Sequence, residues 1–184
     1  MKRKNENRLI KGKKGMDIVK GQKGDVPDVL DIISRCTKHM ESQRIYQWDE
    51  AYPDANIIEE DIESGHSYVI KDKGRCIAYA AINEEIEEEP PEHSQLKWSS
   101  DGRKVLFIHR LAVLPEYQGR GIAKKMLGFI EDFALKNDYS SIRLVAYGGN
   151  ETALKLYENF GYKRAGQLRY PHMEYPFCCY EKDI

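Results

Sequence analysis

The candidate residues for proton transfer in this sequence are His109 and Tyr157. Imidazole has a pKa near neutrality, so His109 can take a proton from an ammonium group, directly or through water. The Tyr157 phenol has an ordinary pKa of about 10, so it stays protonated at neutral pH and can donate to a leaving group. Asn150 precedes Tyr157 by seven residues, about two helical turns, so their side chains would share a helix face with Ala153 between them.

A second candidate site is the turn Gln118-Gly119-Arg120-Gly121-Ile122-Ala123. Residues 106–113 form a short apolar run that predicts a buried strand, and residues 122–136 have the apolar spacing of an amphipathic helix. Where a strand runs into a helix, the N–H groups of the first turn lack intrahelical partners, and the helix dipole adds about half a positive charge. The two glycines let an anion approach the main chain, so we predict a phosphate-binding loop.

Two common phosphate-binding motifs do not account for this turn. A Walker loop ends in Gly-Lys-Ser/Thr, and a dinucleotide fingerprint has three glycines with an acidic residue about 20 positions further on. The turn at 118–123 has neither feature. It contains instead the pattern Q/R-x-x-G-x-G/A, at Gln118, Gly121 and Ala123, after a predicted strand that ends in Leu-Ala-Val.

Through this pattern the sequence resembles the GCN5-related N-acetyltransferases, the GNAT family. A second block, Asn150-x-x-Ala153-x-x-x-Tyr157-x-x-Phe160-Gly161-Tyr162, resembles the next helix and strand of that family, at the expected distance downstream. The two blocks cover residues 106–167, about a third of the chain. The resemblance implies a single-domain GNAT fold, an α/β structure whose mixed central sheet has helices on both faces.

The resemblance also implies acetyl-CoA as the acetyl donor. In the family the glycine-containing loop holds the pyrophosphate, and the pantetheine arm pairs with the main chain of the preceding strand. Tyr157 then corresponds to the general acid toward the CoA sulfur, and Asn150 lies near the pantetheine. The implied cofactor-binding residues are Leu111, Ala112, Val113, Gln118, Gly119, Arg120, Gly121, Ile122, Ala123, Asn150, Ala153 and Tyr157.

His109 lies on the predicted central strand, on the same face as Phe107. Arylalkylamine acetyltransferases of the family carry His-x-His on this strand; here His109 matches the second histidine and Phe107 replaces the first. The glutamate base of the family's histone acetyltransferases would also fall on Phe107, so that base is missing. His109 is therefore the candidate general base, and a chain of water molecules or a purely structural core histidine are the alternatives.

The expected activity is an N-acetyltransferase that moves the acetyl group directly to a primary amine of a small molecule or peptide in a ternary complex. No cysteine lies within the motif to act as a covalent nucleophile, which favours direct transfer. Six acidic residues between Glu84 and Glu92 could attract a cationic amine, or could form only a solvated loop. The alternative function is a non-catalytic CoA-binding regulatory module, and the sequence leaves open the acceptor and a homodimer.

The elements that must position these residues follow from apolar periodicity and turn residues. Strands are predicted at 17–22, 66–70, 76–82, 106–113, 141–146, 162–167 and 177–181. Helices are predicted at 26–41, over a second region from 44 to 64 that Pro53 interrupts, at 122–136 and after Asn150. The order βααβββαβαββ predicts antiparallel pairs early in the sheet and a parallel crossover at the glycine-containing turn.

Length and composition fit one domain, with 184 residues, 41% apolar and 32% charged. Basic residues cluster only at the start, so we expect residues 1–15 to be a flexible basic tail and 16–184 the acetyltransferase domain. An arm that binds nucleic acid or another partner is the alternative for residues 1–15. The net charge of −1 argues against nucleic acid as a partner. No apolar run reaches the roughly 18 residues that span a membrane, and the four cysteines lack metal-ligand spacing. We therefore expect a cytoplasmic protein with reduced thiols, no membrane partner and no metal.

Overall fold

The computed structural model describes residues 16–49, 51–85, 96–99 and 104–184. Within these ranges the strands are β1 (Met16–Lys20), β2 (Ser67–Asp72), β3 (Arg75–Asn83), β4 (Val105–Val113), β5 (Ser141–Tyr147), β6 (Lys163–Leu168) and β7 (Phe177–Asp183). The α-helices are α1 (Val26–Ser42), α2 (Ala55–Glu63), α3 (Ile122–Lys136) and α4 (Glu151–Asn159). Short 3₁₀ turns, η1 (Lys23–Asp25) and η2 (Pro115–Tyr117), precede α1 and α3. The element order is the predicted one, and the expected basic tail at 1–15 lies outside the described residues.

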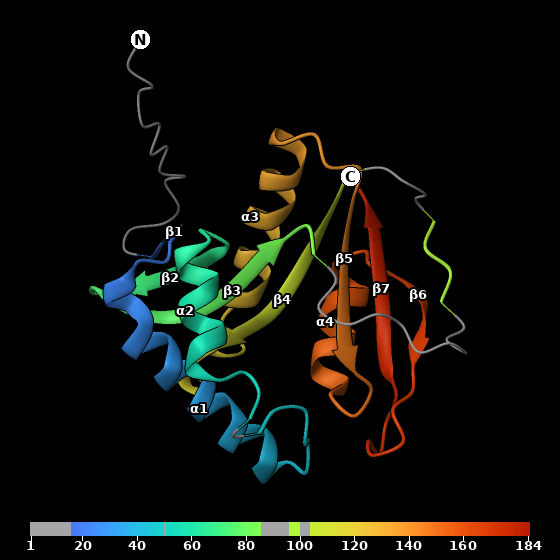
Figure 1. The fold of residues 1–184 in the computed structure, drawn as a ribbon, viewed down its shortest axis with the longest axis horizontal. Coiled ribbons are helices and arrows are strands. Elements are labelled where there is room, and N and C mark those ends of the chain that lie inside the picture. Colours follow the sequence, from blue (N-terminus) through green and yellow to red (C-terminus); the bar gives the residue numbers. More distant parts are fainter. Residues whose placement is uncertain (1–15, 50, 86–95, 100–103) are drawn as a thin grey trace.

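All of the described strands form one mixed sheet in the order β1-β2-β3-β4-β5-β7-β6 (Figure 1). The β4–β5 pair is parallel, and the other neighbouring strands are antiparallel. The parallel pair forms because α3 carries the chain back across the sheet between β4 and β5. The predicted α/β sheet with a crossover at the glycine-containing turn is therefore confirmed.

Helices cover both faces of the sheet (Figure 1). On one face lie α1 and α2, and Asp61 of α2 accepts a hydrogen bond from the Tyr79 hydroxyl of β3. On the other face lie α3 and α4, which meet at Lys182 of β7. The Lys182 ammonium donates to Glu131 of α3 at 2.5 Å and to the Phe160 carbonyl after α4 at 2.8 Å.

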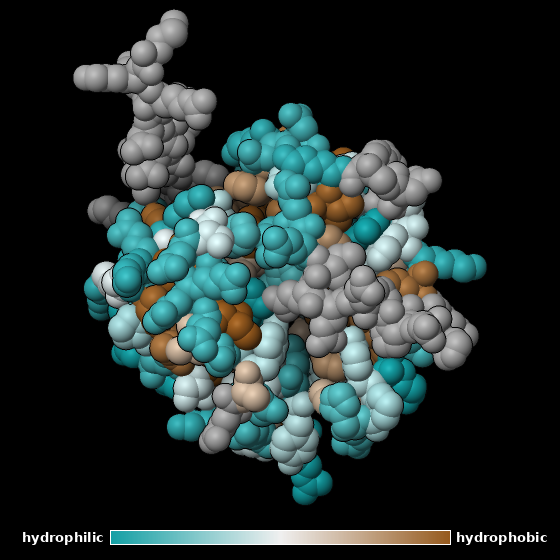
Figure 2. Space-filling model, in the orientation of Figure 1, coloured by the Kyte–Doolittle hydropathy of each residue, from teal (hydrophilic) through white to brown (hydrophobic). Residues whose placement is uncertain are grey.

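The amphipathic character of α1 explains its place on the surface of the sheet. It buries Val29, Ile32 and Ile33 against the strands. Hydrophilic side chains predominate on the outer side of α1 and α2, which Figure 2 shows in teal. The helix therefore gains its stability mainly from one apolar stripe.

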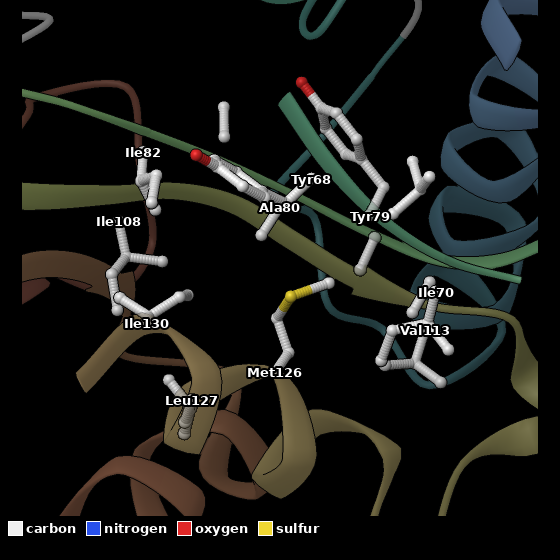
Figure 3. Close-up of a cluster of buried hydrophobic side chains, with 14 of the residues drawn as sticks. Tyr68, Ile70, Tyr79, Ala80, Ile82, Ile108, Val113, Met126, Leu127 and Ile130 are labelled. Atoms are coloured by element: carbon white, nitrogen blue, oxygen red, sulfur yellow. The ribbon is translucent and has the colours of Figure 1, made fainter. Parts of the chain in front are cut away.

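The centre of the sheet packs against α3. Met126, Leu127 and Ile130 are buried, and Met126 and Ile130 point toward the strands (Figure 3). They lie near a set of buried sheet residues, namely Tyr68, Ile70, Ala80, Ile82, Ile108 and Val113. Because neighbouring residues of a strand face opposite sides, Phe107 and His109 project toward the face that carries α1 and α2.

A β-bulge in β4 changes the direction of its side chains. Tyr79 and Ala81 of β3 are two residues apart, whereas their β4 partners Ala112 and His109 are three residues apart. Arg110 lies within the bulge and has a φ of 51°, which residues other than glycine rarely adopt. As a result the Arg110 side chain faces α2, on the same side of the sheet as His109.

The predicted helical region over residues 44–48 is wrong. After α1 ends at Ser42, Arg44 has a φ of 62°, which turns the chain out of the helical path. The Asp49 carboxylate then accepts hydrogen bonds from the N–H groups of Ala51 and Tyr52, at 2.8 and 3.0 Å. No described residue from 43 to 54 is helical, because these local turns satisfy the backbone instead.

Candidate active site

A cavity of about 1080 Å³ lies where β4 and β5 separate. The pairing of these parallel strands ends at Ile108 and Leu144. Beyond that point the two strands diverge, as Figure 1 shows, and residues 109–113 of β4 line the cavity together with Val145 and Ala146 of β5. The opened sheet thus presents a strand edge along a cavity large enough for an extended ligand.

The predicted phosphate loop lines this cavity through Gln118, Gly119, Gly121, Ile122 and Ala123. Gly119 and Gly121 have φ values of 70° and 80°, and a Cβ on either residue would meet no atom within 4 Å. The backbone conformation therefore favours glycine, which also leaves open space beside the main chain. The first turn of α3 follows directly, as an anion site at a helix N-terminus requires.

Polar side chains around the loop take different positions. Gln118 donates from Nε2 to the Val113 carbonyl at 3.0 Å, which ties the loop to the end of β4. The Arg120 guanidinium lies over the Tyr117 ring, 5.4 Å from its centroid, and Arg120 is not among the cavity-lining residues. Lys124, which was not among the predicted site residues, lines the cavity instead. Its ammonium group adds a cation beside the loop.

α4 brings Asn150, Ala153 and Tyr157 to the same cavity. Asn150 is the N-cap of this helix, since its Oδ1 accepts a hydrogen bond from the Ala153 N–H at 3.1 Å. Its Nδ2 donates to Gln47 Oε1 at 3.2 Å, which ties α4 to the segment after α1. Asn150 therefore orients α4, and its contact with a cofactor stays a prediction.

Tyr157 lies in a mainly apolar setting within the cavity wall. Tyr157 is 8% exposed, and its ring packs against those of Tyr162 and Tyr180 with centroid distances of 6.0 and 6.1 Å. Burial raises the pKa of Tyr157 to about 12. The phenol therefore keeps its proton throughout the physiological pH range and has it available for donation.

His109 lines the cavity from β4, and its Nε2 lies 2.9 Å from Asn83 Oδ1 at the end of β3. Its ring is stacked with that of Phe107, 6.2 Å between centroids, so the predicted shared face is confirmed. Burial lowers the pKa of His109, and the opposing effects of Asp61 and Glu85 offset only part of this. The imidazole is therefore mainly neutral at pH 7 and able to accept a proton.

A buried polar network beside His109 was not predicted from the sequence. Arg110 forms a bidentate ion pair with Asp61, in which the Nη2–Oδ1 distance is 2.8 Å and the Nε–Oδ2 distance is 3.0 Å. The two side chains are only 3% and 7% exposed. Tyr79 donates to Asp61, and Arg110 Nη1 donates to the Tyr52 hydroxyl at 3.1 Å. Since the two charges neutralise each other, the network forms a rigid wall of the cavity without a net charge.

Aromatic side chains form much of the remaining wall. They come from segments far apart in the chain, so no local spacing could have predicted the group, which includes Trp48, Tyr52, Trp98, Phe107, Tyr117, Tyr170 and Phe177. The Trp98 ring packs on the Arg143 guanidinium at 4.4 Å, which holds this part of the wall against β5. Flat apolar surfaces of this kind favour ligands with apolar or cationic groups.

No helix within the described ranges has the length and apolarity needed to cross a bilayer. Among the same residues, no group of three or more His, Cys, Asp or Glu side chains is placed to hold a metal ion.

A mixed sheet that opens at a parallel crossover, with a glycine-containing loop leading into a helix beside the opening, defines a class of α/β folds. Comparison with protein families gives the particular one: the model of the Acetyltransferase (GNAT) family matches residues 27–162. The chain belongs to the GNAT family, as the sequence resemblance predicted.

Individual relatives agree with this family. The N-alpha-acetyltransferase RimI of Mycobacterium tuberculosis is 28% identical over 137 residues, which are 73% of this chain and 75% of RimI. A GNAT acetyltransferase structure from Streptococcus agalactiae matches with a TM-score of 0.75 at 23% identity, over 93% of this chain and 96% of that one. A chain of the NatC complex bound to Gag peptide and CoA has a TM-score of 0.66 at 18% identity, over 92% and 99% of the two chains. At these identities the two structures show only that this chain has the same fold.

The chain spans about a third of the length of the first curated relatives that it matches.

Proposed function

We propose that this protein is an acetyl-CoA-dependent N-acetyltransferase that transfers the acetyl group directly to a primary amine in a ternary complex. One observation carries the proposal: a single cavity is lined by the glycine-containing loop, by the open part of β4, and by both Tyr157 and His109. A donor and an acceptor can therefore meet in one space. Membership of the GNAT family supports acetyl-CoA as the donor.

Direct transfer is also supported by the state of the cysteines in the cavity wall. Cys36 and Cys179 line the cavity, and burial raises the pKa of each thiol to about 11. A thiol with such a pKa is a poor nucleophile near pH 7, because the thiolate is the reactive form. Transfer through a cysteine-bound acetyl group is therefore disfavoured. The four free, buried cysteines also suit a reducing compartment, and we place the enzyme in the cytoplasm.

Acetyl-CoA supplies an acetyl group activated as a thioester. In this proposal residues 118–123 hold its pyrophosphate with help from Lys124, and the main chain of residues 111–113 holds the pantetheine arm. His109 accepts a proton from the ammonium form of the acceptor. The amine nitrogen then bonds to the thioester carbonyl carbon, and the C–S bond breaks as Tyr157 donates its proton to the departing thiolate. The second proton of the nitrogen returns the Tyr157 phenolate to the phenol, so the products are the amide and the CoA thiol. The surroundings of both side chains favour the protonation states that these roles need, since burial keeps each of them uncharged.

The charge of the cavity wall supports a cationic amine as the acceptor. Among the described residues the carboxylates of Glu60, Asp61 and Glu85 line the cavity, and Arg110 neutralises that of Asp61. Lys124, a further basic lining residue, lies at the loop that would hold phosphate. The part of the cavity away from the loop is thus negative and partly aromatic, which attracts a protonated amine.

The test is turnover with a panel of acceptors. The purified chain is mixed with acetyl-CoA and small amines, polyamines, aminoglycosides or peptides with free N-termini, and both released CoA thiol and acetylated product are measured. We expect thiol release that depends on one class of amine, with initial rates that indicate a ternary complex. If calorimetry shows CoA binding and no amine is acetylated, the chain is instead a CoA-binding regulatory module.

A further inference from the structure

Asn83, the last residue of β3, contacts the histidine of the proposed site. Its Oδ1 lies 2.9 Å from His109 Nε2 on the neighbouring strand β4. The same oxygen accepts a hydrogen bond from the Glu85 N–H at 3.0 Å. This second donor identifies the atom that faces the ring, because a main-chain N–H can bond only to the amide oxygen and not to the amide nitrogen.

The contact determines which ring nitrogen of His109 carries the proton. An amide oxygen can only accept, so Nε2 must donate. In a neutral imidazole the lone pair then lies on Nδ1. We propose that Asn83 is a positioning residue for acetyl transfer, which orients the His109 ring and holds the Nε2–H tautomer so that Nδ1 takes the proton of the amine. The inference rests on the proposed role of His109 as general base.

The charged groups around the ring explain why an amide suits this position. Burial disfavours the protonated ring most strongly, whereas Asp61 of α2, a hydrogen bond to the main chain of Glu85 and the Glu85 carboxylate all favour it. Arg110 of β4 is paired with Asp61 and reduces its effect. Asn83 supplies the hydrogen bond without a further negative charge. A carboxylate there would keep both hydrogen bonds and would stabilise the imidazolium, which cannot act as a base.

Asn83→Asp therefore separates orientation from charge. In the full chain with ¹⁵N-labelled histidine, NMR titration reads the tautomer and the pKa of His109. We expect the Nε2–H tautomer in the wild-type chain and in Asn83→Asp, and a pKa of His109 that the substitution raises by about 1 to 2. The acidic limb of the pH profile of kcat/KM should shift to higher pH by the same number of pH units. The plateau value of kcat/KM at high pH should stay close to that of the wild type.

Asn159→Asp is the matched control, because it makes the same change of charge at an exposed position on α4. It should alter neither the His109 titration nor the pH profile. Asn83→Ala removes the hydrogen bond from Asn83, so the Nδ1–H tautomer should become populated. At low and neutral pH kcat/KM should fall about tenfold, less than the roughly 10²- to 10⁴-fold contribution of a general base, and the loss should shrink as the pH approaches the pKa of the amine. The KM for acetyl-CoA should stay the same.

The outcomes distinguish this inference from the proposed function. An unchanged tautomer and pKa of His109 in both Asn83 variants would overturn the positioning role, even in an active enzyme. If the titration of His109 responds as expected but the wild-type chain acetylates no amine, the link between Asn83 and His109 stands and the proposed function fails. If Asn83→Asp raises the pKa of His109 but leaves the pH profile of kcat/KM unchanged, His109 is not the base.

Discussion

Burial acts on Tyr157 and His109 in opposite directions on the pKa scale, and it suits both proposed roles. Removing a group from water disfavours its charged form. The pKa of the Tyr157 phenol therefore rises and that of the His109 imidazole falls. One physical cause thus leaves the acid with its proton and the base without one, before any substrate binds.

Tyr157→Phe tests the acid. The ring would keep its contacts with Tyr162 and Tyr180, so Tm and CoA affinity should hardly change, while kcat falls by about 10²-fold, as for other lost acid catalysts. Steady-state kinetics, calorimetry and thermal melts measure these quantities. The control is Tyr162→Phe, since the Tyr162 hydroxyl is buried without a hydrogen-bond partner among the described residues and should be dispensable for kcat. Full activity in Tyr157→Phe would rule out the acid role.

His109→Ala tests the base through its pH dependence. The lowered pKa of His109 leaves the wild-type ring neutral at pH 7, so the variant should lose kcat/KM mainly at low and neutral pH. The loss should shrink as the pH approaches the pKa of the amine, where free amine is already abundant. His172→Ala provides the control, because His172 is exposed and is not itself a cavity-lining residue, although its ring lies 6.0 Å from that of Tyr170. An equal loss at every pH would indicate that His109 only supports packing.

At the scale of elements, the junction between β4 and α3 combines a conformational need with a binding role. Gly119 and Gly121 have positive φ values, and the space beside them is open. A side chain at either position would therefore cost backbone energy and would also project toward a bound phosphate. The backbone cost and the effect on phosphate binding can be separated experimentally, because Gly74 also has a positive φ but lies outside the loop.

Gly121→Asp should weaken CoA binding by about 2 kcal/mol or more, since it brings a negative side chain to the anion site. Gly74→Asp is the matched control: Gly74 has a φ of 85°, its Cβ position is also open, and it lies in the β2–β3 turn. Both variants should lose similar stability in thermal melts, and only Gly121→Asp should lose CoA affinity by calorimetry. Unchanged affinity in folded Gly121→Asp would show that the loop does not hold the pyrophosphate.

At the scale of the whole molecule, buried tyrosines make stability depend on alkaline pH. Burial raises the pKa of Tyr79, Tyr157 and Tyr162 above the ordinary value, to about 12 for Tyr157. Below a pH of about 10 these phenols are neutral in both the folded and the unfolded chain, so their contribution to stability is complete. Above it the unfolded chain ionises first, and stability is lost as the pH rises toward the folded-state pKa.

The free energy of unfolding should therefore fall more gently with pH in Tyr157→Phe than in the wild type. Between pH 10 and 12 the difference in slope should be about 1.4 kcal/mol per pH unit, the value for one ionising group. Urea unfolding at a series of pH values measures it. Tyr46→Phe is the control, because Tyr46 is 58% exposed. Equal slopes in the wild type and Tyr157→Phe would mean that the Tyr157 phenol ionises freely in the folded chain.

The sequence by itself determined those features that depend on local spacing. Periodicity and turn residues predicted the order of helices and strands, because each helix or strand has its own repeat of apolar side chains. The glycine pattern at 118–123 predicted a strand, turn and helix around a phosphate loop. The seven-residue interval from Asn150 placed Tyr157 two turns along α4, where the structure has both residues lining one cavity. Over residues 44–48 the same reasoning failed, because local turns replaced the expected helix.

Only the tertiary structure decided which distant side chains meet. Asp61 and Arg110 are 49 residues apart in the sequence. Their pairing depends on the β-bulge at Arg110, which the residue pattern of β4 does not predict. Asn83 reaches His109 only because β3 and β4 are neighbours in one register. The direction of each pKa shift likewise follows from burial by side chains far along the chain. Local spacing sets where a side chain points on its own element, whereas its partners and its protonation state depend on what the other elements pack around it.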